Sequence, residues 1–135
     1  MAEFWVRLSS ASKRRGFLEF GTPENASALG TSAGLGAAWI FHHRAKHLRA
    51  GVVTKDIQSR NPDEVIFKVK DKQGIIEEQT GKKLVIDMPR EGSPSGRAYV
   101  KITSFDAEND STWDGTIEEA LDAMKVFVNE LGRTI

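Results

Sequence analysis

The sequence contains no cysteine and only a single tyrosine among its 135 residues. The absence of cysteine excludes disulfide frameworks, thiolate metal centres and cysteine nucleophiles. No apolar run approaches the roughly 20 residues that a membrane-spanning helix requires. The first positive charges follow the apolar N-terminal residues instead of preceding them, which is unlike a secretory signal. We therefore expect a cytoplasmic protein without membrane association, folded as a single domain over residues 1–135.

Net charge is also lacking, because 19 basic side chains balance 19 acidic ones. This balance excludes a polybasic protein whose affinity for nucleic acid comes from many phosphate contacts. The charges are nevertheless segregated along the chain. Residues 42–55 hold all three histidines and four basic side chains but no acid, whereas residues 105–122 hold seven acids and no base.

Hydrophobic periodicity predicts three helices and four strands. A capping box of Thr116 and Glu119 predicts the start of the last helix, which Gly132 ends. Residues 21–36 contain four glycines, two serines and a proline, and this composition predicts a loop. The expected helices cover residues 2–15, 62–80 and 116–131, and the expected strands cover residues 37–44, 48–55, 84–88 and 98–105.

The resulting order, α-β-β-α-β-β-α, predicts an α+β fold. We expect a mainly antiparallel four-stranded sheet with the helices packed mostly on one face, so that the other face can meet solvent, a ligand or a second subunit. A helix competes with the strands over residues 37–49, because Ala38, Phe41, Ala45 and Leu48 also fall at helical spacing.

Several short motifs together resemble those of a known family. They are an N-terminal aromatic pair, a stretch with glycine and tryptophan, a strand with two valines, a Glu-then-Gly ending of the middle helix and a tryptophan before the last helix. The residues in question are Phe4, Trp5, Gly34, Gly36, Trp39, Val52, Val53, Glu77, Glu78, Gly81 and Trp113.

With this pattern the chain resembles a bacterial and archaeal family of domains of unknown function, often found C-terminal to predicted restriction or nuclease-like proteins. It departs from the family at Asp87, where the family tends to show a Trp-Glu pair. The resemblance implies an accessory domain of a nuclease or defence system. Stand-alone chains of this length also resemble the orphan proteins of mobile gene cassettes.

Patterns for metal binding and catalysis are incomplete. Pro62 and Asp63 begin like a restriction-type nuclease motif, but no later acid stands two positions before a lysine. On a strand, His42 and His43 point to opposite faces and cannot share an ion. The acids at 106–110 lack the glycine that a calcium loop needs. We therefore predict no metal, no cofactor and no catalytic residue, and the sequence favours a protein that is not an enzyme.

The basic cluster, which is the basic side chains and histidines of residues 42–55, is the strongest candidate for a functional site. We expect a small binding module, forming a homo-oligomer through its complementary charge clusters, with a basic and aromatic surface around residues 39–49. One alternative is a nucleic-acid-binding accessory domain of a nuclease or defence system, with nucleic acid or a protein as the partner. Another alternative is a small-molecule enzyme with a pocket under the 21–36 loop. The candidate binding residues are Trp39, His43, Arg44, Lys46 and Arg49, and those of the alternative pocket are Glu78, Asp87 and Arg97.

Overall fold

The computed structural model describes residues 2–21, 27–34, 37–54, 62–87 and 96–132 of the chain. The strands of these segments form one antiparallel five-stranded sheet in the order β1-β2-β3-β5-β4. The elements are α1 (Ala2–Arg14), β1 (Ala28–Gly34), β2 (Ala37–His43), β3 (Leu48–Thr54), α2 (Pro62–Asp71), α3 (Gln73–Thr80), β4 (Val85–Asp87), β5 (Arg97–Ile102), a short 3₁₀ helix η1 (Asp110–Thr112) and α4 (Trp113–Leu131). The expected α+β class is confirmed.

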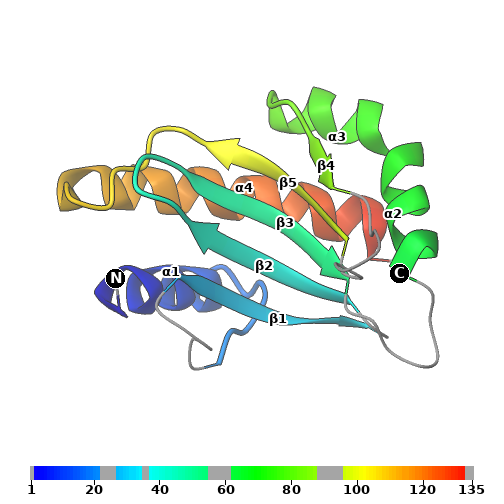
Figure 1. Ribbon diagram of the computed structural model, residues 1–135. Coiled ribbons are helices and arrows are strands. Elements are labelled where there is room, and N and C mark those ends of the chain that lie inside the picture. The colour runs from blue at the N-terminus through cyan, green and yellow to red at the C-terminus, as the bar shows by residue number, and fades with distance from the viewer. Residues whose placement is uncertain (1, 22–26, 35–36, 55–61, 88–95, 133–135) are drawn as a thin grey trace.

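Helices α1 and α4 lie behind the sheet in the view of Figure 1, while α2 and α3 flank the end that carries β4. Both long helices are amphipathic, and each turns its apolar stripe towards the sheet. The fully buried side chains include Phe4 and Leu8 of α1, Phe41 of β2, and Met124 and Phe127 of α4. The hydrophobic core therefore lies between the sheet and these two helices.

An aromatic cluster joins α1 to the start of α4. The ring of Phe4 lies 5.2 Å from Trp5, 5.0 Å from Phe105 and 5.6 Å from Trp113, measured between centroids. The tilted and edge-to-face geometries are those that aromatic quadrupoles favour. His43, at the end of β2, completes the cluster with its ring 6.0 Å from that of Trp5. This cluster closes the core beneath the turn between β2 and β3.

Residues 37–43 and 48–54 form paired strands, so the prediction of strands is confirmed and the helical alternative is wrong. In β2 the buried residues Ala37, Trp39 and Phe41 alternate with the less buried Ala38 and Ile40. This period of two is the pattern of a strand with one face against a core. The strands expected over residues 84–88 and 98–105 are also neighbours, because β4 and β5 pair antiparallel.

The four-strand sheet is corrected to five strands, because residues 28–34 form β1 at the edge of the sheet and are not a loop. Leu29 is buried and lies opposite Phe41 of β2. Burial of this one large residue and the ladder to β2 outweigh the weak strand propensity of the surrounding glycines, alanine and serine. Residues 22–26 and 35–36 of the expected loop lie outside the described residues.

The predicted helix over 62–80 is two helices, interrupted at Lys72. The N–H of Lys72 donates to the carbonyl of Val69 at 3.0 Å, a tightened turn, and its own carbonyl then accepts from Ile76 at 3.0 Å as α3 begins. Gly81 ends α3 in the left-handed conformation with φ of 68°, as predicted.

The predicted capping box of the last helix is wrong, because α4 begins one turn earlier, at Trp113. Asn109 caps η1 there by accepting a hydrogen bond from the N–H of Ser111. Thr116 is instead buried, with its hydroxyl 3.0 Å from that of Ser104, and Glu119 contacts Ser104 and Lys82. Both residues therefore attach α4 to the end of β5 and to the segment after α3, and neither caps the helix.

Candidate functional site

The sheet face opposite α1 and α4 carries the side chains that alternate with the core. In the described part of the chain no helix lies across this face, which looks towards the viewer in Figure 1 and is called the open face here. Strand register arranges its residues in three rows across the sheet. The first row is Ala28, His42, Arg49 and Lys101, the second is Gly30, Ile40, Gly51, Tyr99 and Val85, and the third is Ser32, Ala38, Val53, Arg97 and Asp87.

Gly51 occupies the centre of the middle row, where no side chain fits. A Cβ atom built on it would lie 2.0 Å from the carbonyl oxygen of Ala98 and 2.7 Å from the Cα of Tyr99. Both distances are far below van der Waals contact, and both neighbouring atoms are backbone. Strands β3 and β5 can therefore approach as they do only because residue 51 is glycine.

The missing side chain leaves room beside Gly51 for the ring of Tyr99. Tyr99 is only 8% exposed although it belongs to the open face. The guanidinium of Arg49 lies over this ring, 4.5 Å from its centroid, and the Nε–H of Arg49 donates to Nε2 of His47 at 3.3 Å. Stacking and hydrogen bonding together hold the Arg49 side chain in one place on the face.

A hollow of about 220 Å³ lies on the open face between the basic row and the third row. It is smaller than the pockets that bind drug-sized ligands. Its lining is mostly apolar, with basic groups and His42 among the lining residues. The described lining consists of Ala28, Ile40, His42, Arg49, Val52, Val53, Arg97, Ala98 and Tyr99.

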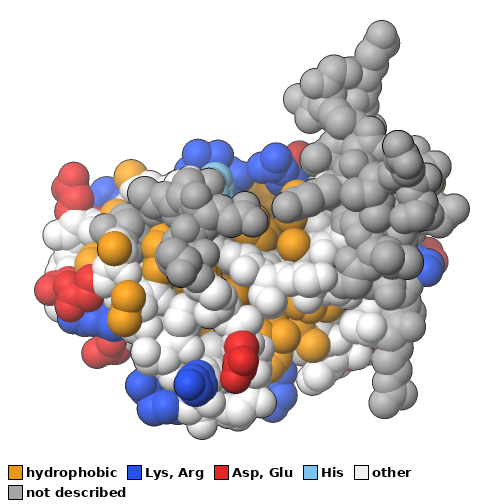
Figure 2. Space-filling view, turned by 90° about the horizontal axis from the view of Figure 1, so that it is seen from below, with side chains coloured by type: hydrophobic (Ala, Val, Ile, Leu, Met, Phe, Trp, Pro, Cys, Tyr) orange, Lys and Arg blue, Asp and Glu red, His pale blue; other side chains and the backbone are white. Residues whose placement is uncertain are grey.

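Positive charge dominates this face. Among the described residues, Arg49, Arg97 and Lys101 form no ion pair. Burial lowers the pKa of His42, and the charges of Arg44 and Arg49 lower it further. Figure 2 shows the result from the side: Lys, Arg and His side chains gather along the upper edge, which is the open face.

The acidic cluster, which is the seven acids of residues 105–122, is partly paired within the molecule. Five of its seven acids form ion pairs, and three of the basic partners come from outside the basic cluster: Arg7, Arg15 and Lys82. Most of these pairs are exposed and contribute little to stability, roughly 0–1 kcal/mol each. Their consequence is electrostatic, because they offset part of the charge of the acidic cluster, whereas Arg49, Arg97 and Lys101 of the open face form no ion pair with described acids.

The structure separates the five predicted binding residues. Trp39 is only 4% exposed and points with His43 to the core face, so neither lies on the open face. Arg44 and Lys46 are exposed in the turn between β2 and β3. Arg49 alone lies on the open face and lines the hollow.

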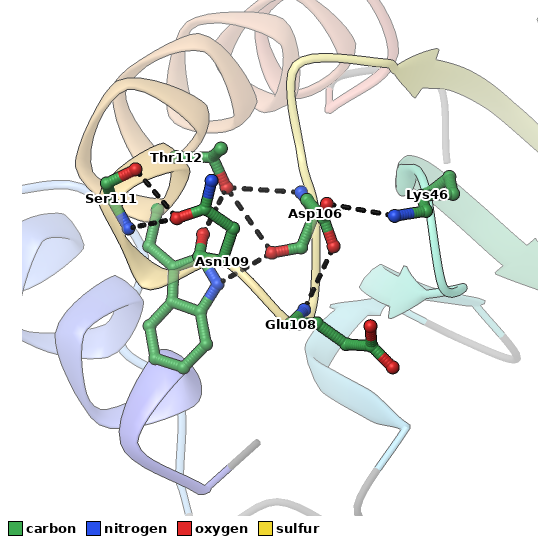
Figure 3. Close-up of polar contacts among 7 residues, drawn as sticks. Lys46, Asp106, Glu108, Asn109, Ser111 and Thr112 are labelled. Atoms are coloured by element: carbon green, nitrogen blue, oxygen red, sulfur yellow. Dashed lines mark hydrogen bonds and ion pairs between the residues drawn. The ribbon is translucent and has the colours of Figure 1, made fainter.

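Lys46 has a structural partner, shown in Figure 3. Its ammonium lies 2.9 Å from the carboxylate of Asp106. The backbone carbonyl of Asp106 accepts a hydrogen bond from Nε1 of Trp113 at 3.1 Å. Thr112 donates to and accepts from the backbone of Asp106 as well. This network joins the β2–β3 turn to the start of α4 and gives Lys46 a role without any ligand.

The three residues of the alternative pocket are only partly brought together. Asp87 of β4 and Arg97 of β5 are cross-strand neighbours in the third row. Arg97 lines the hollow, whereas Asp87 and Glu78 do not, and Glu78 is exposed on α3. Within the described residues, no three histidine or acidic side chains converge as a metal site would require. No described helix is long and apolar enough to span a membrane.

Comparisons with known proteins assign no family. No family model matches the chain, and no curated protein matches it. Among solved structures, YbjN from E. coli, proposed to be a transcription regulator, superposes with a TM-score of 0.42 and 13% sequence identity, over 93% of this chain and 90% of that chain. The predicted kinship with nuclease-associated domains and gene cassettes stays a prediction.

Proposed function

We propose that this protein is a binding module that takes an anionic partner on the open face of its sheet. The observation that carries the proposal is the hollow beside Arg49 and Arg97, two side chains that form no ion pair with a described acid. A charged side chain held at a concave site without a counter-ion gains favourable interaction when an anion enters. Of the basic surface expected around residues 39–49, the proposal keeps Arg49 and adds Arg97 of β5.

The nucleic-acid alternative receives less support from the geometry. Proteins that bind single strands stack bases on exposed aromatic rings. Trp39 is in the core, and the face of Tyr99 is already covered by Arg49. The open face therefore offers cations for phosphate but no described ring for a base.

Titration of isotope-labelled protein with three anions, monitored by amide chemical shifts, tests the proposal. The anions are inorganic phosphate, hexanoate and a short single-stranded DNA. We expect at least one of them to shift resonances confined to β2, β3 and β5. The double variant Arg49→Gln/Arg97→Gln should lose these shifts, whereas Lys125→Gln, on the exposed side of α4, should keep them.

Absence of shifts with all three anions would contradict the proposal, as would shifts that persist in the double variant. A response to DNA alone that collapses as salt is raised would favour the nucleic-acid alternative, because phosphate contacts release counter-ions.

A further inference from the structure

The hollow on the open face also indicates what kind of anion it takes, an inference that rests on the proposed function. Its floor is made by the side chains of Ile40 and Val53, with Ala28 on the β1 side. Gly30 and Gly51 flank Ile40 in the middle row and contribute no side chain to it. The space is therefore a depression between aliphatic groups.

Arg49 supplies a fixed anion anchor at the edge of this depression. Its Nε–H is engaged by His47 and its guanidinium plane lies on Tyr99. Among the described residues its two Nη atoms have no hydrogen-bond partner, so they remain available as a pair of donors. Such a fork matches the two oxygens of a carboxylate, and little side-chain entropy is lost on binding because the fork is already positioned.

Charge and apolar surface lie within one small site, and this combination selects among anions. Inorganic phosphate would use the guanidinium group of Arg49 but would leave the aliphatic floor in contact with water. A nucleic acid would need an exposed ring on which to stack. A ligand with one anionic end and a short apolar body satisfies both parts of the site.

We propose that the hollow binds a small organic carboxylate, with its carboxylate group on the Arg49 guanidinium and its apolar body on Ile40 and Val53. The positioned fork lies at the Arg49 end of the hollow, whereas Arg97 lies in the third row at the other end. We therefore expect the carboxylate at the Arg49 end and the apolar body between the two arginines. The volume of about 220 Å³ limits the length of the body that can be buried.

A chain-length series tests this assignment: acetate, butyrate, hexanoate and octanoate, with hexanol and inorganic phosphate as matched comparisons, by amide chemical-shift titration. We expect the dissociation constant to fall by about fourfold per added methylene while the body still enters the hollow, and then to level off. Hexanol and phosphate should bind much more weakly than hexanoate.

Three variants separate the two parts of the site. Arg49→Gln should weaken every carboxylate by about tenfold or more without changing the gain per methylene. Ala28→Leu adds a larger side chain on the β1 side of the hollow. The gain in affinity per methylene should then level off at a shorter carboxylate than in the wild type. Lys125→Gln should leave the whole series unchanged. Thermal unfolding of each variant verifies that it is folded.

The possible failures are distinguishable. If acetate and hexanoate bind equally, or if phosphate binds as tightly as hexanoate, the proposal of an organic carboxylate ligand is wrong. The proposal that the open face binds anions is then still supported. If hexanol equals hexanoate, the site is an apolar one and the role of Arg49 is wrong. If none of the anions shifts the open face, this inference and the proposed function fail together.

Discussion

At the scale of single residues, Gly51 is where the backbone leaves least freedom. A methyl group at this position would collide with the backbone of β5 at Ala98 and Tyr99. We expect Gly51→Ala to lower the free energy of unfolding by about 1–3 kcal/mol, because strands β3 and β5 must separate locally. Urea denaturation followed by circular dichroism measures the change.

A matched substitution is available at Gly74 in α3, where an added Cβ meets no atom within 4 Å. Gly74→Ala should leave stability unchanged or raise it by up to about 1 kcal/mol, since alanine favours the helix. Equal effects of the two substitutions would mean that the close approach at Gly51 is not a constraint on the fold.

The histidines of the open face make a second prediction at this scale. Burial and then the charge of Arg49 lower the pKa of His47, and the pKa of His42 is lowered in the same way by burial and then Arg44. A lowered pKa means that the unfolded chain binds protons more readily than the folded one near the ordinary histidine pKa of about 6.5. Stability from these groups is therefore complete above this pH and is lost as the pH falls below it.

We expect the melting temperature to fall between about pH 7 and pH 5 and the double variant His42→Gln/His47→Gln to show a shallower fall. The Lys46 ammonium lowers the pKa of Asp106, so that carboxylate titrates only in more acidic solution. Lys125→Gln provides the control with the wild-type slope. Identical slopes in the wild type and the double variant would contradict the assignment.

At the scale of elements, β1 is the strand that the amino-acid composition does not predict. Only Leu29 among its seven residues is a large apolar side chain, and it is 1% exposed. We expect Leu29→Ala to destabilise the protein by about 2–5 kcal/mol, as truncation in a packed core does. Ile75→Ala, at a half-exposed site on α3, should cost much less.

Guanidinium or urea unfolding of both variants measures this difference. If Leu29→Ala lowers the free energy of unfolding by less than about 1 kcal/mol, residues 28–34 are the surface loop that their composition predicts, because a loop residue buries little apolar area.

Periodicity sufficed for the elements whose apolar residues recur regularly, such as α1, α4 and the β2–β3 pair. It failed where tertiary contacts override local preference. Residues 28–34 are a strand because β2 lies beside them, and Thr116 looks like a cap although the helix had already begun at Trp113. Neither fact can be read from spacing alone.

The candidate site was predictable only in part for a related reason. Arg49 and Arg97 stand out as charges, but their place on one face, at the two ends of one hollow, follows from the pairing of β3 with β5. Tyr99, Ile40 and Val53 carry no signal in the sequence beyond alternation. Alternation shows which residues share a strand face, and register is needed to place them in one hollow.

At the scale of the whole molecule, the zero net charge combines an acidic cluster that is partly paired within the chain with unpaired basic side chains on the open face. The sequence predicts a homo-oligomer held by complementary clusters. Because five acids of the acidic cluster already have partners within the chain, an assembly of that kind must compete with ion pairs such as Arg15 with Asp122. Self-association stays a prediction.

Light scattering at micromolar protein, in low and high salt, tests it. Association through charge should produce a particle of more than one chain that dissociates as salt is added, since screening weakens exposed charges. A single chain at both salt concentrations would contradict the prediction of a homo-oligomer.

The distribution of aromatic residues makes the protein its own reporter. The three tryptophans, Trp5, Trp39 and Trp113, all belong to the core on the helix side, and Tyr99 is the one tyrosine of the sequence. Tryptophan fluorescence therefore monitors the packing of the helices. Fluorotyrosine incorporated during expression would give a single fluorine resonance beside the hollow, so unfolding and ligand entry can be observed separately in the same unmutated chain.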